Sequence, residues 1–205
     1  MLLSLLESLT RKLNIFELQR SYFLNICLLL FIVFTFMYRY WDVFFKRYGS
    51  RGRVYFGWTL YLLAISHTLI GIFSLCEFFF IRRQYNPIIG IISLACFTTG
   101  QIIRNLAIAS LKEFHSAHIE IKPNHQLIQT GPYKRIRNPY YVGVMLEVLS
   151  TPLILNSFFT FLFSIFVYLP ELFIRVFLEE KILTNQLGCC YASYLKKVPR
   201  FLPRF

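Results

Sequence analysis

The chain of 205 residues is long enough for one domain, and 56% of its residues are hydrophobic while only 16% are charged. Because soluble proteins average about 25% charged residues, this composition excludes a disordered chain, a collagen and an ordinary soluble enzyme. The net charge of +12 comes from basic residues that lie between apolar blocks rather than along one face. This arrangement favours an integral membrane protein, whose partner is the lipid bilayer and not nucleic acid.

The apolar blocks predict an all-α membrane fold with about five transmembrane helices. The first twenty residues form a basic, amphipathic lead-in rather than a convincing cleavable signal peptide. A spanning helix needs about 20 mostly apolar residues, so the last block, 140–178, is too long for one crossing. It suits a helical hairpin of spans four and five that breaks at Leu155–Ser157, after Pro152. The expected spans before it are 21–45, 57–81 and 87–106.

Lysine and arginine residues set the expected orientation. Sixteen of them fall in the linkers after spans one and three and in the tail, against five in the segments on the opposite side. By the positive-inside rule, this bias places the N-terminus outside and the C-terminus in the cytoplasm. The polar sequence is also concentrated on the cytoplasmic side. We therefore expect the chemistry in a catalytic half over 109–205, which follows the N-terminal membrane spans of 1–108.

The first stretch that could carry chemistry runs from His125 to Gly143. It contains a Gly–Pro turn signal, and Pro139 suits the first turn of the fourth span with Asn138 as its N-cap. The free N–H groups at such a helix start favour an anionic group. The alternative is purely structural, namely a capped helix with interfacial tyrosines and arginines.

Three charged residues, Glu171, Arg175 and Glu179, are spaced by four and share one face of the last span. Charges within a span cost about 2.5–3.5 kcal/mol each near the bilayer centre, so they are expected to face a cavity or a partner. Two interpretations remain open. The three residues form a salt-bridged ladder without a ligand, or Arg175 holds a substrate carboxylate through paired hydrogen bonds.

The tail and several isolated polar residues give weaker signals. Residues 187–203 predict a helix stop, a short amphipathic helix and an extended apolar anchor. No histidine pattern or cysteine spacing indicates a metal site. Polar residues inside the spans are more typical of hydrogen bonds between helices than of catalysts; they are His67, Glu77, Gln101, Arg104 and Glu147.

Taken together, these blocks resemble the isoprenylcysteine carboxyl methyltransferase family of integral membrane enzymes. The family pattern has H-x-L-V-x-x-G-x-Y, then R-H-P-x-Y-x-G, a hydrophobic hairpin, R-x-x-x-E-E and a tail of F-G-x-x-Y-x-x-Y-x-x-x-V-P. One position departs from it, because Asn138 stands where the family has histidine. The corresponding segments are His125 to Tyr133, Arg137 to Gly143, Arg175 with Glu179 and Glu180, and Leu187 to Pro199.

The resemblance implies S-adenosylmethionine as the methyl donor, bound in a pocket at the cytoplasmic boundary. It implies a lipophilic acceptor, in the first place the C-terminal carboxylate of a prenylated cysteine. Arg175 would orient that acceptor, with Arg137 as a second catalytic residue, and we also assign Glu147 to the acceptor site. The residues that the resemblance assigns to the cofactor are His125, Gln126, Leu127, Ile128, Tyr133, Asn138, Pro139, Tyr140, Tyr141 and Glu179.

Other functions stay open from the sequence. A phenolic lipid or a phospholipid amine is an alternative acceptor, although such groups need deprotonation and Arg175 favours an anion. A transporter or a non-catalytic scaffold would bind no cofactor. The expected location is the inner membrane of a prokaryote or the endoplasmic reticulum of a eukaryote.

Overall fold

The computed structural model describes residues 26–45, 50–81 and 85–203. The chain divides into two compact units, 1–40 and 41–205. In the first unit the described residues are all helical. The N-terminal lead-in and several basic residues used to predict the orientation lie outside the described residues; these are Arg11, Lys12, Arg20, Lys46, Arg47, Arg82, Arg83 and Arg204.

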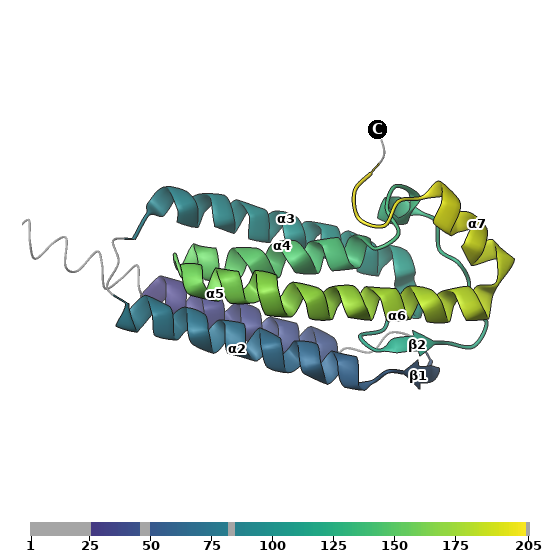
Figure 1. Ribbon diagram of the computed structural model, residues 1–205, viewed down its shortest axis with the longest axis horizontal. Helices are drawn as coiled ribbons and strands as arrows, with labels where there is room; N and C mark the ends of the chain where they lie inside the picture. The colour runs from purple at the N-terminus through teal and green to yellow at the C-terminus, as the bar shows by residue number, and fades with distance from the viewer. Residues whose placement is uncertain (1–25, 46–49, 82–84, 204–205) are drawn as a thin grey trace, which may run out of the picture. The chain divides into compact units, whose positions relative to one another are not determined.

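The second unit consists of long helices that run lengthwise, with small elements gathered at one end (Figure 1). The long elements are α2, α3, α4 and the continuous run of α5, η4 and α6, while β1, β2 and α7 lie at the end. The elements are η1 (Trp41–Phe45), β1 (Arg53–Tyr55), α2 (Trp58–Phe80), α3 (Pro87–Leu111), η2 (Lys112–Phe114), β2 (Ile119–Ile121), η3 (Gly131–Lys134), α4 (Pro139–Ile154), α5 (Phe158–Phe163), η4 (Ser164–Tyr168), α6 (Leu169–Leu187) and α7 (Cys189–Lys197).

The predicted multi-pass helical fold is confirmed. The expected fourth span is α4, whose 16 residues reach only about 24 Å, less than the hydrocarbon core of about 30 Å. The hairpin breaks where the sequence predicts, because α4 ends at Ile154 and Asn156 adopts a φ of +56° before α5 begins. In the described part of the chain, four helices are long and apolar enough to cross a membrane: Ile26–Phe45, Trp58–Phe80, Pro87–Phe114 and Phe158–Leu187.

Helices α3 and α4 make the most extensive contact between described elements. Two glycines allow their backbones to touch. A Cβ atom on Gly100 would lie 2.8 Å from the carbonyl oxygen of Gly143, and one on Gly143 would lie 2.7 Å from that of Gly100. Close approach at small residues is typical of membrane helices, because apolar lipid gives little hydrophobic drive to their association. This packing fixes the start of α4 against α3.

Charged side chains inside the spans bond between elements, as the sequence predicted. Arg104 of α3 is fully buried; its Nη1 donates to Asp42 of η1 at 2.6 Å and its Nε donates to Glu147 of α4 at 2.8 Å. At the other end of the unit, both carboxylate oxygens of Glu77 accept hydrogen bonds from α5, including the amide of Thr160 at 2.9 Å. These pairs satisfy charges that water cannot reach.

The small antiparallel sheet is the one departure from the expected all-α fold among the described residues. Arg53 pairs with Ile121 and Tyr55 with Ile119. Strands of three residues are too short to show an alternating pattern in the sequence. The sheet anchors the loop that follows α3 to the segment that precedes α2.

Candidate functional site

Arg175 lies buried in α6, the helix that contacts β2. Its guanidinium donates three hydrogen bonds, all to neutral acceptors. Nε bonds to the hydroxyl of Tyr141 at 3.1 Å, Nη1 bonds to Oγ1 of Thr59 at 2.7 Å, and Nη2 bonds to the carbonyl oxygen of Ala117. The Tyr141 hydroxyl in turn donates to a carboxylate oxygen of Glu179. A tyrosine hydroxyl therefore bridges a buried cation and a carboxylate.

The salt-bridged ladder that the spacing allowed is absent from the described part of the chain. Glu171 accepts a hydrogen bond from the hydroxyl of Ser66 at 2.9 Å instead. No carboxylate of the described residues lies within ion-pair distance of Arg175. The three side chains share one face of α6, but each hydrogen-bonds to residues of α2 or α4 instead of to another member of the ladder.

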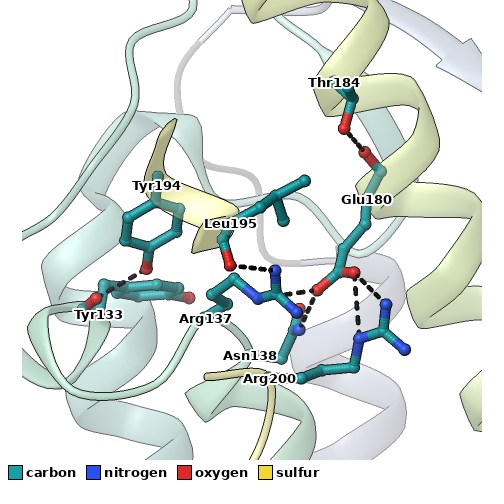
Figure 2. Close-up of polar contacts among 8 residues, drawn as sticks. All are labelled: Tyr133, Arg137, Asn138, Glu180, Thr184, Tyr194, Leu195 and Arg200. Carbon is teal, nitrogen blue, oxygen red and sulfur yellow. Dashed lines mark hydrogen bonds and ion pairs between the residues drawn. The ribbon is translucent and has the colours of Figure 1, made fainter. Parts of the chain in front are cut away.

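Glu180, the next residue of α6, holds a second cluster (Figure 2). Its Oε1 accepts from the side-chain amide of Asn138 at 2.8 Å and lies 3.4 Å from Nε of Arg137, as an ion pair without hydrogen-bond geometry. Its Oε2 accepts from Nη2 of Arg200 at 2.6 Å and from Nε of the same residue at 3.1 Å. One carboxylate thus joins α6, the loop before α4 and the C-terminal tail.

Asn138 does not cap α4 with its side chain, so the predicted capping bond is wrong. It occupies the N-cap position, and its carbonyl accepts the first helical bond from the amide of Val142 at 3.1 Å. Its side-chain amide donates to Glu180 instead. A capping bond would need the side-chain oxygen to accept a backbone N–H of the first turn, but the charge-assisted bond from the amide nitrogen to Glu180 fixes the orientation of the side chain instead.

Two tyrosines hold the turn η3 against α7. The hydroxyl of Tyr194 donates to the carbonyl oxygen of Tyr133 at 2.7 Å. Burial raises the pKa of Tyr133 well above its usual range, and the nearby charge of Glu179 raises it further. Burial likewise raises the pKa of Tyr194 to about 12, with Glu180 adding to the rise and Arg137 opposing it. Both hydroxyls therefore remain protonated at neutral pH.

The loop after β2 carries His125, whose ring packs edge-on against Phe114 with centroids 5.1 Å apart. Burial lowers the pKa of His125, and the positive charge of Lys122 lowers it further. Its Nδ1 is buried and has no hydrogen-bond partner among the described residues. Nearby in the chain, His115 packs against Tyr140 with centroids 5.3 Å apart. The loop after β2 thus contributes an imidazole with one unpartnered ring nitrogen, and the segment before β2 contributes a second imidazole that packs against α4.

The other residues assigned to the cofactor from the sequence differ in exposure. Gln126 is exposed, Leu127 and Ile128 are half-buried in the loop, and Pro139 is buried at the start of α4. Their proposed contacts with a cofactor stay predictions.

His118 lies beside Arg175, since it follows Ala117 in the chain. Burial lowers the pKa of His118 and the charge of Arg175 lowers it further, while Glu120 opposes the shift. Its Nδ1 is buried and has no hydrogen-bond partner in the part of the chain that the structure describes. His118 therefore provides a neutral imidazole next to the buried cation.

Glu147 lies apart from these residues along α4. Six positions separate it from Tyr141, which is about 9 Å along a helix axis. Its carboxylate accepts from Arg104 within the buried cluster of α3, α4 and η1. The described contacts give Glu147 a structural role, and its contact with an acceptor stays a prediction.

Several residues of the site carried no signal in the sequence. Thr59 and Ala117 bind Arg175 from positions 116 and 58 residues away in the chain. In the sequence Arg200 is only one of several basic residues of the tail, and the structure pairs it with Glu180. Local spacing cannot reveal such partners, because tertiary packing alone brings them together.

Comparison with known proteins gives consistent matches. The model of the isoprenylcysteine carboxyl methyltransferase family matches residues 92–185. The uncharacterized protein YpbQ of Bacillus subtilis is 32% identical over 141 residues, which make up 67% of this chain and 82% of that protein. A protein-S-isoprenylcysteine O-methyltransferase of Schizosaccharomyces pombe is 34% identical over 108 residues, or 51% of this chain and 45% of that enzyme.

A solved structure supports the same fold. The structure of a eukaryotic intramembrane Ras methyltransferase, an isoprenylcysteine carboxyl methyltransferase, matches with a TM-score of 0.54 and 22% sequence identity. The match covers 68% of this chain and 51% of that one. This chain therefore spans about half the length of the two eukaryotic enzymes, and most of the length of YpbQ.

Proposed function

This chain belongs to the isoprenylcysteine carboxyl methyltransferase family and is a methyltransferase, and from that premise we propose the reaction that it catalyses. The proposed reaction transfers a methyl group from S-adenosylmethionine to the carboxylate of a lipid-tailed acceptor, most specifically a prenylated cysteine. The proposed site lies at the boundary of the membrane, where α6, the start of α4 and the loop after β2 meet.

The observation that supports this proposal is the environment of Arg175. Its guanidinium has five N–H donors, and three are used by neutral acceptors of the described chain. A buried charge without a directly bound counter-charge is costly. An acceptor carboxylate would offset that cost by binding the two remaining N–H groups, with the fork geometry that arginine offers to carboxylates.

Helix α6 separates a buried charged face from a lipid-facing one. Phe173, Ile174 and Phe177 are large exposed hydrophobic residues one or two positions from Arg175, so they lie on other faces of the helix than the buried guanidinium. In a membrane these residues meet lipid, which supports a lipophilic acceptor that reaches the site from the bilayer.

The residues present also fit S-adenosylmethionine. The ligand carries a cationic sulfonium, hydroxyl groups and an aromatic base, and the site offers the carboxylate of Glu179, the unpartnered Nδ1 of His125 and the aromatic faces of Tyr140 and His115. We propose that these groups and the remaining sequence-assigned residues hold it. When bound, the cofactor supplies an electrophilic methyl group.

Positioning accounts for most of the expected rate enhancement. A carboxylate acceptor is already ionised at neutral pH, so no strong base is needed. Arg175 orients the acceptor, and the Tyr141 hydroxyl fixes Arg175 relative to Glu179. Holding reactants in this way converts a bimolecular step into an effectively unimolecular one. The guanidinium of Arg137 is bound by Glu180 and by the carbonyl of Leu195, which favours a supporting role for it.

The test separates cofactor binding from transfer. Calorimetry on the purified protein in detergent measures the Kd for S-adenosylmethionine, and turnover is measured with farnesylated cysteine. Glu179→Gln should weaken cofactor binding. Arg175→Lys keeps the buried charge but loses the fork, so it should leave cofactor binding largely intact and reduce turnover about 100-fold. Glu171→Gln, on the same face of α6, is the matched control.

Two results would contradict the proposal. Absence of saturable cofactor binding by the folded wild-type protein, in detergent and in lipid bilayers, would favour a scaffold or transporter. Equal turnover of Arg175→Lys and wild type would remove Arg175 from the acceptor site.

One observation favours a second acceptor class. His118 is a neutral imidazole with an unpartnered nitrogen beside Arg175, and a phenolic hydroxyl or an amine would need such a base. His118→Gln distinguishes the two. It leaves turnover of a carboxylate acceptor unchanged and lowers turnover of an acceptor that must lose a proton.

A further inference from the structure

The C-terminal tail is fastened to the loop that precedes α4. The backbone amide of Arg137 donates to the carbonyl of Pro199 at 2.9 Å, and that of Asn138 donates to the carbonyl of Arg200 at 3.2 Å. The guanidinium of Arg137 also donates to the carbonyl of Leu195 at 3.2 Å. Two consecutive loop residues thus take their backbone partners from the tail.

Glu180 is the charged centre of this junction (Figure 2). Its side chain is 7% exposed and its two oxygens face opposite parts, with Arg137 and Asn138 of the loop on Oε1 and Arg200 of the tail on Oε2. Arg137 is 11% exposed and Arg200 is 42% exposed. Without the carboxylate, the guanidinium groups of Arg137 and Arg200 would lie near each other without a shared counter-charge, and their like charges would repel.

The loop that Glu180 fastens is the one that carries the proposed cofactor residues. Tyr133 and Asn138 lie on it, and Tyr133 is held in addition by the hydroxyl of Tyr194 of α7. The neighbouring residue Glu179 bonds instead to Tyr141. The two adjacent glutamates of α6 therefore serve different parts of the site.

We propose that Glu180 is a positioning residue for the cofactor site, and that the Glu180–Arg200 ion pair keeps the loop in its binding geometry through the tail. This inference rests on the proposed function. Arg200 lies outside the residues that the family model matches, so the comparison does not assign it this part. Neither residue has to touch the cofactor, because both act through Arg137 and Asn138.

The experiment combines cofactor binding with hydrogen exchange of the backbone amides over residues 131–141, both in detergent. Glu180→Gln keeps an acceptor for Asn138 but removes the charge, and it should raise exchange over the loop and weaken S-adenosylmethionine binding about 10-fold. Arg200→Gln should do the same to a smaller extent, because its pair is partly exposed. Arg200→Lys should lie between Arg200→Gln and wild type.

The double variant Glu180→Gln/Arg200→Gln supplies the specific readout. If the two residues act as one unit, it binds no more weakly than Glu180→Gln alone. Lys197→Gln removes one exposed charge from the same tail and should change neither exchange nor binding. Arg200→Gln keeps the inference testable if Glu180→Gln fails to fold.

The outcomes separate the two proposals. Raised loop exchange with unchanged binding overturns the positioning role and leaves the proposed function standing. Unchanged exchange over residues 131–141 in both single variants overturns the proposal that the Glu180–Arg200 ion pair holds the loop. Absence of cofactor binding by the folded wild type overturns the proposed function, and the positioning role with it.

Discussion

Two histidines of the candidate site, His118 and His125, favour the neutral form in the folded protein. Burial is the main cause for both, and a neighbouring cation adds to it: Arg175 for His118 and Lys122 for His125. The unfolded chain has no such bias, so its histidines titrate near the ordinary pKa of about 6.5. Each lowered pKa is therefore a link between pH and stability.

We expect the protein to lose stability as the pH falls below about 6.5. Below that pH the histidines of the unfolded state bind protons while those of the folded state stay neutral, so unfolding becomes more favourable. The loss of stability grows until the pH falls below the pKa of the folded state. Thermal unfolding in detergent between pH 7.5 and pH 5 measures this effect. His118→Gln/His125→Gln should flatten the profile, and a wild-type profile that is already flat over this range would contradict it.

Glu120 of β2, which lies between the two histidines in the chain, does not obscure this pH range. Burial alone would raise the pKa of Glu120, but hydrogen bonds from Ser116 and from the amide of Gly52, together with the charge of Lys122, lower it overall. Its contribution to stability is present above the ordinary carboxylate range and is lost only at more acidic pH. Glu120 therefore adds its own loss of stability only below the pH range in which the histidines titrate.

Among the elements, the pair α3 and α4 fixes the position of the site. The start of α4 carries Tyr141 and is preceded by Asn138, so a shift of this helix moves the partners of both Arg175 and Glu180. The contact of Gly100 with Gly143 sets how closely α4 can approach. A single methyl group added at this contact should therefore displace α4 and with it the partners of Arg175 and Glu180.

We expect Gly143→Ala to destabilise the protein by about 1–3 kcal/mol, as overpacked cores commonly are. Its new Cβ would lie 2.8 Å from the backbone nitrogen of Arg104 as well as 2.7 Å from the carbonyl oxygen of Gly100. Gly57→Ala is the matched control, because a Cβ there meets only a side-chain atom of Val54 at 3.7 Å. Equal thermal midpoints for the two variants would show that the helices separate without cost.

The elements also show what the sequence could and could not predict. Spans and the hairpin break follow from hydropathy and from Pro152, Asn156 and their neighbours, which are local properties. The partners of Arg175 are not local: Thr59 comes from α2 and Ala117 from the turn before β2. The sequence predicts a side-chain cap from Asn138, yet the side chain of this N-cap residue is oriented by a bond to a carboxylate 42 residues away. Motif spacing therefore predicts which residues belong to the candidate site, while tertiary packing decides their contacts.

At the scale of the whole molecule, the distribution of basic residues predicts the orientation of the chain in the membrane. The linkers and tail expected on one side hold sixteen lysines and arginines against five opposite. Placing these residues in the cytoplasm puts α7 and the proposed site on the side where a soluble cofactor is available. Orientation is thus a condition of the proposed reaction and can be measured separately from it.

Cysteine labelling tests the orientation, because Cys189 and Cys190 at the start of α7 are exposed. In a background with Cys27, Cys76 and Cys96 replaced by serine, a membrane-impermeant maleimide should label them in inside-out vesicles and not in intact cells. The variant Gln84→Cys, with Cys189 and Cys190 also replaced, is the matched control. It follows Arg82 and Arg83, which the charge bias places outside, so it should label in intact cells. Labelling of Cys189 and Cys190 in intact cells would reverse the assignment and place the proposed site away from the cytoplasmic cofactor.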